Sequence, residues 1–398
     1  MITPFRICVG VLSIALLAVV SLGQKVTSLA SNSPSGFSLR PSESQEFALV
    51  LRSGEVCDIK VKGDSRLFLE MEVIDPSGRQ MLKGGDAMQG YLFIAESAGT
   101  YRIIVKNTDT SPENSTVSSS ASIVYSNKLN LPKNAKTTAT RIVNGYSARI
   151  VDEAGDDAST YLTIQKGGKT LGIMRAEKEM TGGFYFSDDA SKYTPKNSVA
   201  LMRSTVDKTG DGTPDIAVEY YSGGAHCCFQ ITFFELGDRV RQLPVIDTDN
   251  DQLTAFAKKP GGGLRFRASE QAFAYWAIAF AYSPMPTVIY EFDRFDQLVP
   301  RFDLMKKPAP TLAKLKQMAA ATRAKLNLNP YTSPEDNFND FEEPFWGEML
   351  DLIYTGHEDL AWQYFEMVWP AKKPGKDKFL ADFKEQLALT AYGDRKKK

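Results

Sequence analysis

The sequence of 398 residues contains few histidines and cysteines and almost no net charge. It has two histidines, and His357 begins a zincin-like pattern in which Ala361 stands where the second histidine ligand belongs. The 47 basic residues are balanced by 48 acidic ones, so no net positive field attracts a polyanion. The composition therefore argues against zinc chemistry and against a nucleic-acid partner.

Long uncharged hydrophobic runs are also scarce, and the one that stands out lies at the N-terminus. Arg6 is followed by an uncharged, mostly apolar run over residues 7–22, and small residues follow up to Ala30. This layout predicts a secretory signal peptide over residues 1–30, with an uncleaved N-terminal signal anchor as the alternative. We therefore expect an extracytoplasmic protein, in the periplasm, at the cell surface or secreted, with no membrane span after cleavage.

Four cysteines are too few for a disulfide-stapled scaffold. Cys8 would leave with the signal peptide, and Cys57, Cys227 and Cys228 would remain. We expect Cys227 and Cys228 to be buried strand thiols or to form a disulfide with each other. The competing interpretation is a nucleophilic pair, because His226 and Cys228 share one face of a strand.

Hydrophobic periodicity divides the chain into β-rich and helical regions. Period-two alternation, typical of half-buried strands, changes to the helical period of 3.6 near Pro308. The predicted fold class is mainly β with a helical C-terminal region. We expect a β-sandwich over residues 38–133, a second β-rich domain over 140–307 and a helical domain over 308–398.

Individual elements follow from the same patterns. Among the strands expected in the second domain are Val199–Met202, Ile216–Tyr221, Phe229–Glu235 and Phe273–Tyr282. The last of these is interpreted as a doubly buried strand rather than as an aromatic platform for sugars. The expected helices are Thr311–Leu326, Phe345–Tyr354, His357–Val368 and Lys376–Thr390.

The first domain resembles a known family of small modules. The stretches LFLEMEVIDPSGRQM, from residue 67, and GYLFIAESAGTYRIIV, from residue 90, resemble the bacterial pre-peptidase C-terminal domain. The resemblance covers about residues 38–130. It implies a jelly-roll-like accessory module without catalytic residues.

Oxygen ligands alternate in one loop of the second domain. A calcium loop needs hard oxygen donors at alternate positions and a tight turn between them. The calcium site predicted on this basis consists of Asp207, Thr209, Asp211, Thr213 and Asp215. An EF-hand is excluded because Val218 stands at the twelfth position. The alternative is an acidic turn in which the aspartates cap their own backbone.

Residues 207–221 also resemble the loop and strand of FG-GAP or VCBS-type repeats, although Thr209 stands where that family prefers Asp or Asn. This resemblance implies calcium as a cofactor. The phrase YYSGGAHCCF, from residue 220, resembles exported bacterial proteins with no assigned activity.

Two further patterns favour plain loops. Asp247, Asp249 and Asp251 alternate without a central glycine, so we expect a solvated loop there. The run Lys259–Gly263 resembles a phosphate cradle, but a strand follows it where a cradle needs a helix N-terminus.

Together these observations predict a non-catalytic exported binding protein or envelope-associated protein with a calcium-braced β-rich domain. Its partner would be an extracellular or envelope protein or a glycan. The alternative is a secreted, peptidase-like hydrolase that uses His226 and Cys228 or an unrecognised pair of carboxylates.

Overall fold

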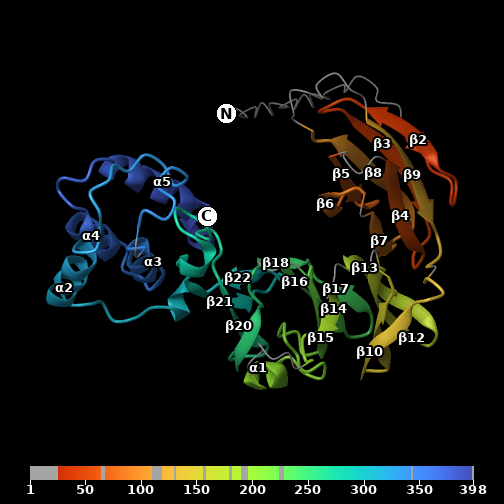
Figure 1. Ribbon diagram of the computed structural model, residues 1–398. Coiled ribbons are helices and arrows are strands. Elements are labelled where there is room, and N and C mark those ends of the chain that lie inside the picture. Colours follow the sequence, from red (N-terminus) through yellow and green to blue (C-terminus); the bar gives the residue numbers. More distant parts are fainter. Residues whose placement is uncertain are drawn as a thin grey trace, which may run out of the picture. The chain divides into compact units, whose positions relative to one another are not determined.

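The computed structural model divides into two compact units, Met1–Leu129 and Asn130–Lys398 (Figure 1). It describes residues 26–396 except for short gaps at 64–67, 89, 110–118, 130, 156–157, 179–181, 190–195, 224–227 and 342–343. Most of the predicted signal peptide thus lies outside the described residues.

The first unit is a β-sandwich of two sheets, with strand orders β1-β3-β8-β5-β6 and β2-β9-β4-β7. Its strands are β1 (Thr27–Ser28), β2 (Ser35–Leu39), β3 (Ser44–Leu51), β4 (Val56–Gly63), β5 (Leu69–Ile74), β6 (Gln80–Asp86), β7 (Tyr91–Ile94), β8 (Gly99–Asn107) and β9 (Ser119–Ser126). Alternate residues of each strand point to one face. In β4, for example, Cys57, Ile59 and Val61 are buried in the core between the sheets.

The second unit begins with three antiparallel sheets. The first contains β10 (Lys136–Val143), β11 (Tyr146–Asp152), β12 (Ala158–Lys166) and β13 (Lys169–Lys178). The second contains β14 (Gly183–Phe186), β15 (Asp215–Tyr221), β16 (Phe229–Leu236), β17 (Val240–Gln242) and β18 (Ile246–Asp249), which also pairs with β16. The third contains β19 (Thr254–Lys258), β20 (Leu264–Ser269), β21 (Thr287–Phe292) and β22 (Leu298–Pro300).

The middle sheet is buried on both faces, which explains its continuous apolar sequence. Ile216 and Val218 of β15 pack in the core shared with the first sheet. The intervening Ala217 and, on β16, Phe233 pack in a second core with residues of the third sheet, including Phe266. The middle sheet therefore shares one apolar core with the first sheet and a second apolar core with the third sheet.

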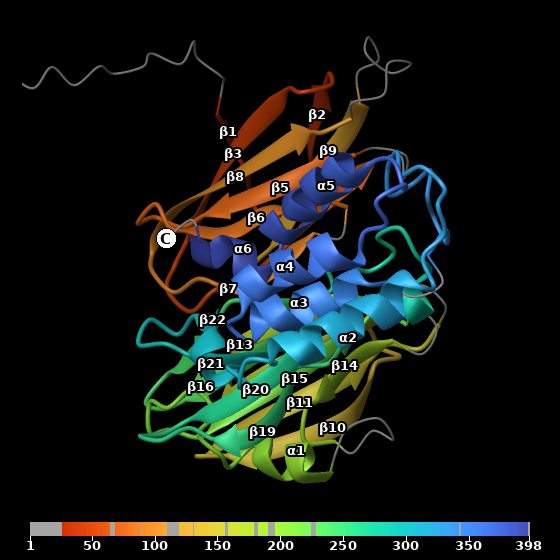
Figure 2. The ribbon, with the colours of Figure 1, turned by 90° about the vertical axis from the view of Figure 1, so that its left-hand side faces the viewer.

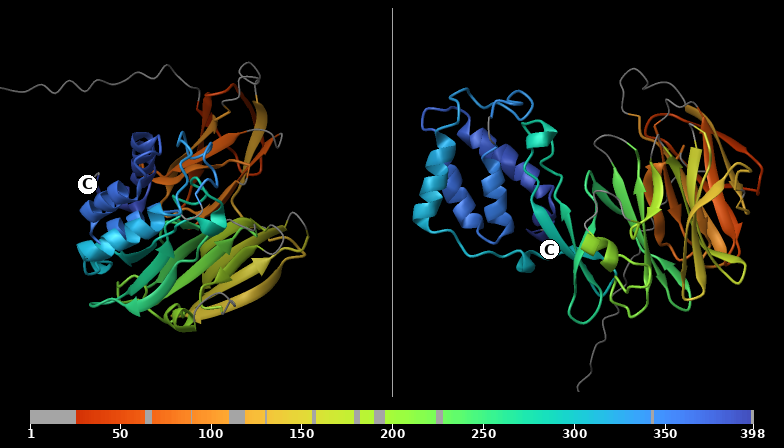
Figure 3. Two further views of the ribbon diagram at one scale, coloured as in Figure 1. Left: turned by 60° about the vertical axis from the view of Figure 1, so that its left-hand side comes forward. Right: turned by 60° about the horizontal axis from the view of Figure 1, so that its bottom comes forward.

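Helices close the second unit. They are α1 (Lys196–Leu201), α2 (Leu312–Arg323), α3 (Trp346–Tyr354), α4 (Glu358–Val368), α5 (Lys376–Ala388) and α6 (Ala391–Lys396), with 3₁₀ turns η2 (Phe280–Tyr282) and η3 (Phe302–Leu304). Helices α2 to α5 gather at one end of the unit (Figures 2 and 3). Their aromatic core includes Val288 of β21 and Phe302 of η3, so it is continuous with the third sheet. Among the described residues, no helix combines the length and the hydropathy needed to cross a bilayer.

The predicted fold class is confirmed: the described chain is mainly β, and its helices cluster in the C-terminal region. Two predicted strands are wrong. Residues 199–201 of the expected strand Val199–Met202 lie in α1, because a short apolar run does not distinguish a strand from a helix. The segment Phe273–Tyr282 forms turns and η2, since Tyr275 and Ala277 have left-handed backbones with φ of 59° and 57°.

Candidate functional site

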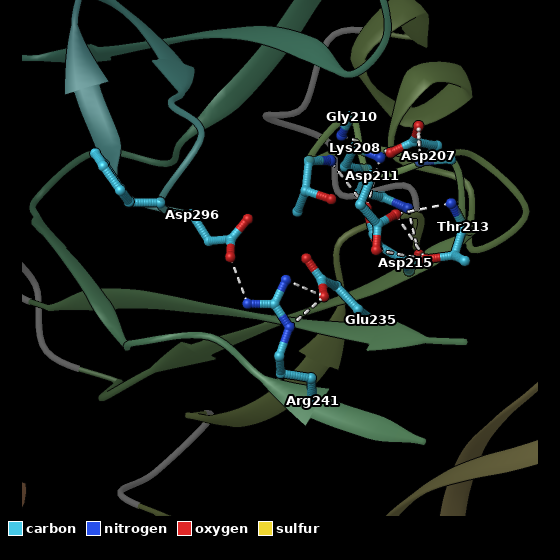
Figure 4. Close-up of polar contacts among 12 residues, drawn as sticks. Asp207, Lys208, Gly210, Asp211, Thr213, Asp215, Glu235, Arg241 and Asp296 are labelled. Atoms are coloured by element: carbon cyan, nitrogen blue, oxygen red, sulfur yellow. Dashed lines mark hydrogen bonds and ion pairs between the residues drawn. The ribbon is translucent and has the colours of Figure 1, made fainter. Parts of the chain in front are cut away.

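The acidic loop between α1 and β15 is stabilised by its own aspartates (Figure 4). The carboxylate of Asp207 accepts hydrogen bonds from the backbone N–H groups of Gly210, at 2.6 Å, and Gly212, at 3.0 Å. Asp211 accepts from the N–H and the hydroxyl of Thr213, at 2.7 and 2.6 Å. These are side chain–backbone turns of the kind that Asp favours.

Lys208 is the second residue of this loop, and its side chain is turned inward. Its side chain is 0% exposed, and its ammonium donates hydrogen bonds to the carbonyl oxygens of Arg203, Val206 and Asp215. The Asp215 carboxylate, also 0% exposed, accepts from the backbone N–H groups of Lys208 and Thr209 through Oδ2. Burial lowers the pKa of Lys208 to about 8, against the opposing effect of Asp215, Asp188 and Asp207. Burial also raises the pKa of Asp215, against the hydrogen bonds from the Lys208 and Thr209 backbone and the charge of Lys208.

The glycine run predicted to be a plain loop packs against the acidic loop. A Cβ on Gly263 would lie 2.9 Å from the Thr209 carbonyl oxygen, and one on Gly210 would lie 3.1 Å from the Gly262 carbonyl oxygen. The N–H of Leu264 donates to the Lys208 carbonyl. These glycines allow two backbones to approach closely.

The five predicted calcium ligands do not form a ready donor cluster. No group of three or more histidine, cysteine or acidic residues in the described part of the chain is placed to hold a metal ion. The carboxylates of Asp207 and Asp211 already accept hydrogen bonds from N–H groups of the loop backbone. The donor set thus does not fit a preformed calcium site, and calcium binding here stays a prediction.

A charged cluster continues from the loop across the middle sheet (Figure 4). Glu235 of β16 is the register partner of Asp215 and forms an ion pair with Arg241, which also contacts Asp296. The side-chain oxygens Asp215 Oδ1, Glu235 Oε1 and Thr209 Oγ1 are buried and have no hydrogen-bond partner among the described residues. Burial raises the pKa of Glu235, and the negative charges of Asp211 and Asp296 add to this effect against the influence of Arg241.

Asp296 also lines a pocket of about 350 Å³, a volume within the range of small-ligand sites. Its wall comes from β18, from the end of β20, from β21 and from the loop before β22. Leu253, Ala268 and Phe292 are buried apolar side chains that line it. No Lys, Arg or His is among the described lining residues.

Four carboxyl groups line this pocket, and they differ in the hydrogen bonds and ion pairs that they form. Glu270 accepts from the N–H groups of Ala272 and Ala391 and from the Tyr354 hydroxyl. Asp296 is paired with Arg241. Asp247 accepts from the N–H of Asp249 and, at 3.4 Å, from the Gln230 side chain.

Asp249 is exposed, as is Asp247, and it has a left-handed backbone at φ 51°. Partial burial raises the pKa of its carboxyl group, as does the charge of Asp247. Gln271, another lining residue, has its Oε1 buried without a hydrogen-bond partner among the described residues. The pocket therefore combines apolar walls, negative charge and free acceptors.

The predicted cysteine site lies mostly outside the described residues, because His226 and Cys227 fall in the gap at 224–227. Cys228 is disulfide-bonded and Cys57 is a free, buried thiol, so the partner of Cys228 is a cysteine outside the described residues. The Cys227–Cys228 pairing stays a prediction. In its disulfide form Cys228 cannot act as a thiolate nucleophile.

Sequence reasoning missed the pocket and interpreted its two most exposed acids, Asp247 and Asp249, as a solvated loop. Asp251, the third member of that run, instead accepts from the Ser269 N–H and so connects the run to β20. The only local signal was the alternation of acids, which does not reveal which other strands line a shared cavity.

Comparison with known families and with curated proteins finds no match. Solved structures that resemble part of the chain include a periplasmic inhibitor of g-type lysozyme from Aeromonas hydrophila, with 16% identity and a TM-score of 0.21 over 26% of this chain and 96% of that one. The pre-peptidase C-terminal domain of a Bacillus anthracis collagenase matches with 14% identity and a TM-score of 0.22, over 26% and 96% of the two chains. A Bacillus licheniformis lipase in propeptide form matches with 11% identity and a TM-score of 0.16, over 67% and 42%. TM-scores this low carry no argument about function.

Proposed function

We propose that this chain is an extracytoplasmic binding protein that takes a basic group of its partner, a lysine or arginine side chain, into the pocket lined by Asp247, Asp249, Glu270 and Asp296. The pocket itself carries the proposal, because it brings four carboxyl groups and an apolar wall together without a basic lining residue. A lysine or arginine side chain offers the complementary chemistry, an apolar stem with a cationic end. The extracytoplasmic location rests on the N-terminal apolar run alone.

Binding fits this pocket better than acid–base chemistry does, because two of its four carboxyl groups are firmly held and a third, of Asp247, accepts one backbone N–H and a long contact from Gln230. Glu270 is fixed by three donors and Asp296 by Arg241. Asp249, Asp247 and the free Gln271 oxygen are left to accept N–H donors from an ammonium or a guanidinium group. Charge-assisted hydrogen bonds of this kind are stronger than neutral ones.

The test uses the full chain and two capped tripeptides, acetyl-Gly-Lys-Gly-amide and acetyl-Gly-Glu-Gly-amide, observed by saturation-transfer NMR. The lysine peptide should bind and the glutamate peptide should not. Asp249→Asn should weaken lysine-peptide binding by roughly fivefold or more, since it removes one of the two exposed carboxyl groups that line the pocket. Asp238→Asn is the matched control, because Asp238 is an exposed acid that does not line the pocket.

Equal signals from both peptides, or an Asp249→Asn variant that binds like Asp238→Asn, would contradict the proposal. Binding should also weaken as salt is raised from 50 to about 500 mM, because exposed charges are screened.

The calcium brace predicted from the sequence remains a separate proposal about the same unit. If calcium binds the folded loop, millimolar calcium should raise Tm relative to a chelator by mass action, and Asp211→Ala should abolish the rise.

A further inference from the structure

We propose that the basic residue enters the pocket on an extended segment of the partner, which pairs with β18 as an added strand. This proposal rests on the function proposed above and adds the backbone conformation in which the partner is bound. Its basis is the way in which β18 lines the pocket.

The pocket follows the edge of β18 rather than one of its faces. Successive side chains of a strand point to opposite faces, so Ile246 and Thr248 lie on one face of β18, and Asp247 and Asp249 lie on the other. All four residues line the pocket, and residues 244–245, which precede the strand, line it too. A cavity that consecutive residues of a strand line meets that strand from its side.

Strand β21, which also contributes to the wall, shows the pattern expected of a face. Its alternate residues Tyr290 and Phe292 line the pocket, whereas Glu291 between them is not a lining residue and forms ion pairs with Arg265 and Arg301. The pocket therefore meets one face of β21 but the edge of β18. A ligand that extends along the pocket would lie beside the backbone of β18.

This edge of β18 is available for pairing. The strand pairs with Gln230 and Ile231 of β16, and β16 pairs on its other side with β15. No further strand pairs with β18 in the described part of the chain. An edge strand presents backbone N–H and C=O groups to an added strand, and several kinds of domain bind extended peptides in this way.

The exposed carboxyl groups of Asp247 and Asp249 favour one kind of added strand. Opposite charges on paired strands stabilise the pairing, and like charges destabilise it. An edge with two acids therefore favours a segment that carries a lysine or an arginine and disfavours an acidic one. Because β18 has only 4 residues, the paired region is short, and the charged side chain must supply part of the affinity.

The experiment compares the heptapeptide acetyl-Thr-Val-Thr-Lys-Thr-Val-Thr-amide with the tripeptide acetyl-Gly-Lys-Gly-amide, each titrated by NMR with the full chain. The heptapeptide offers the same side chain on a backbone that favours the extended form. It should bind at least about tenfold more tightly, because it adds backbone hydrogen bonds to the contacts of the lysine. The heptapeptide with glutamate in place of lysine should not bind.

Two N-methylated heptapeptides separate strand pairing from a general effect of length. One carries N-methyl groups on the two threonines that flank the lysine, and the other carries them on the two valines. The N–H groups of alternate residues in a paired strand point to the same neighbour. One of these peptides should therefore bind at least about tenfold more weakly than the other, since it loses two hydrogen bonds to β18.

Hydrogen exchange shows where the peptide lies. The saturating heptapeptide should slow amide exchange in residues 244–249, and the saturating tripeptide should leave it nearly unchanged. Equal affinities of the heptapeptide and the tripeptide, together with equal affinities of the two N-methylated peptides, would overturn strand pairing and leave the pocket proposal standing. If neither lysine peptide binds, or if the glutamate heptapeptide binds as well as the lysine one, the proposed function itself is wrong.

Discussion

The two carboxyl oxygens of Glu235 differ in their hydrogen bonding, although both belong to a buried side chain. Its side chain is 4% exposed, one oxygen is held by Arg241, and the other has no hydrogen-bond partner among the described residues. A buried acceptor without a donor disfavours the charged form of its group. Burial of the carboxyl group is the main cause of the raised pKa of Glu235, and the charges of Asp211 and Asp296 add to it.

We expect Glu235 to make the second unit less stable as pH rises. Its pKa in the folded state lies above the ordinary value of 4.5, so the folded protein holds this proton more tightly than the unfolded chain does. The stabilising contribution is complete below pH 4.5 and is lost as pH rises through the raised pKa. In Glu235→Gln this part of the pH dependence should disappear, which tryptophan-monitored melting from pH 4 to 8 would measure.

The control is Asp238→Asn, which removes an exposed acid nearby on the same β16–β17 turn. If wild type and Glu235→Gln keep a constant Tm difference across this pH range, the assignment to Glu235 is wrong.

Cys57 gives a prediction for the first unit. It is 0% exposed in the sandwich core, and burial raises the pKa of its thiol, an effect that Asp58 and Glu55 increase. We expect no labelling by a maleimide within an hour at pH 7.5, and rapid labelling in 6 M guanidinium chloride, because the thiolate is the reactive form. Mass spectrometry of the intact chain would measure both, and fast labelling of Cys57 in buffer would contradict the described burial.

At the scale of elements, the turn between β19 and β20 and the acidic loop act as one structure. Gly262 and Gly263 lie against Thr209 and Gly210, backbone to backbone. Each loop therefore limits the shape of the other, although they are about fifty residues apart in the sequence.

Alanine substitutions at two glycines of this turn would distinguish the cost of a left-handed backbone from the cost of pushing two backbones apart. Gly261 and Gly263 both have a positive φ, of 87° and 80°, but only a Cβ on Gly263 would meet backbone atoms, at 2.9 and 3.0 Å. Gly261→Ala should cost about 1 kcal/mol, the ordinary penalty for a left-handed residue. Gly263→Ala should cost about 3 kcal/mol, because the two loops must also move apart. Urea denaturation monitored by tryptophan fluorescence would compare them, and equal costs would show that the loops do not constrain each other.

The sequence predicted best the elements that are specified locally. Helix α2 follows from its 3.6-residue period, and Thr311 caps it by accepting the Lys314 N–H, a short-range signal. The segment Phe273–Tyr282 is specified by distant contacts instead. Trp276 packs edge to face on Trp346 and Phe379 of the helical region. The residues on either side of it have left-handed backbones, which the local sequence does not favour.

The candidate site also has a part that is specified by adjacent residues and a part that depends on distant contacts. The acidic loop could be located because its residues are adjacent, and the alternative of self-capping aspartates describes the observed contacts of Asp207 and Asp211. The pocket could not be located, since Asp249, Glu270 and Asp296 come from segments that only the folded sheets bring together. Nor does any spacing rule show that Lys208 is buried.

At the scale of the whole molecule, the chain consists of two units with separate cores. Within the described part of the chain, the apolar core of the first unit is built from residues before Leu129, and the cores of the second unit are built from residues after Asn130. Each unit therefore has its own source of hydrophobic stabilisation.

We expect a fragment of residues 26–129 to fold alone. It should give a β-type circular dichroism spectrum and a cooperative melt. Ile59→Asp should abolish this melt, because it places a charge in the core, whereas Val50→Asp should be tolerated, since Val50 is 73% exposed. A disordered spectrum for the unmodified fragment would show that its core needs the rest of the chain.

The short strand β1 has a consequence for how the protein's N-terminus can be processed. Thr27 and Ser28 pair in parallel with Phe47 and Ala48 of β3, and the Leu29 N–H donates to the Ala48 carbonyl. Cleavage after Ala30 would remove this strand and leave β3 as an open sheet edge, which can recruit a strand from another molecule. A protease that cut before Thr27 would keep the pairing at Phe47 and Ala48, so two nearby cleavage points would leave different lengths of the β3 edge open to pairing.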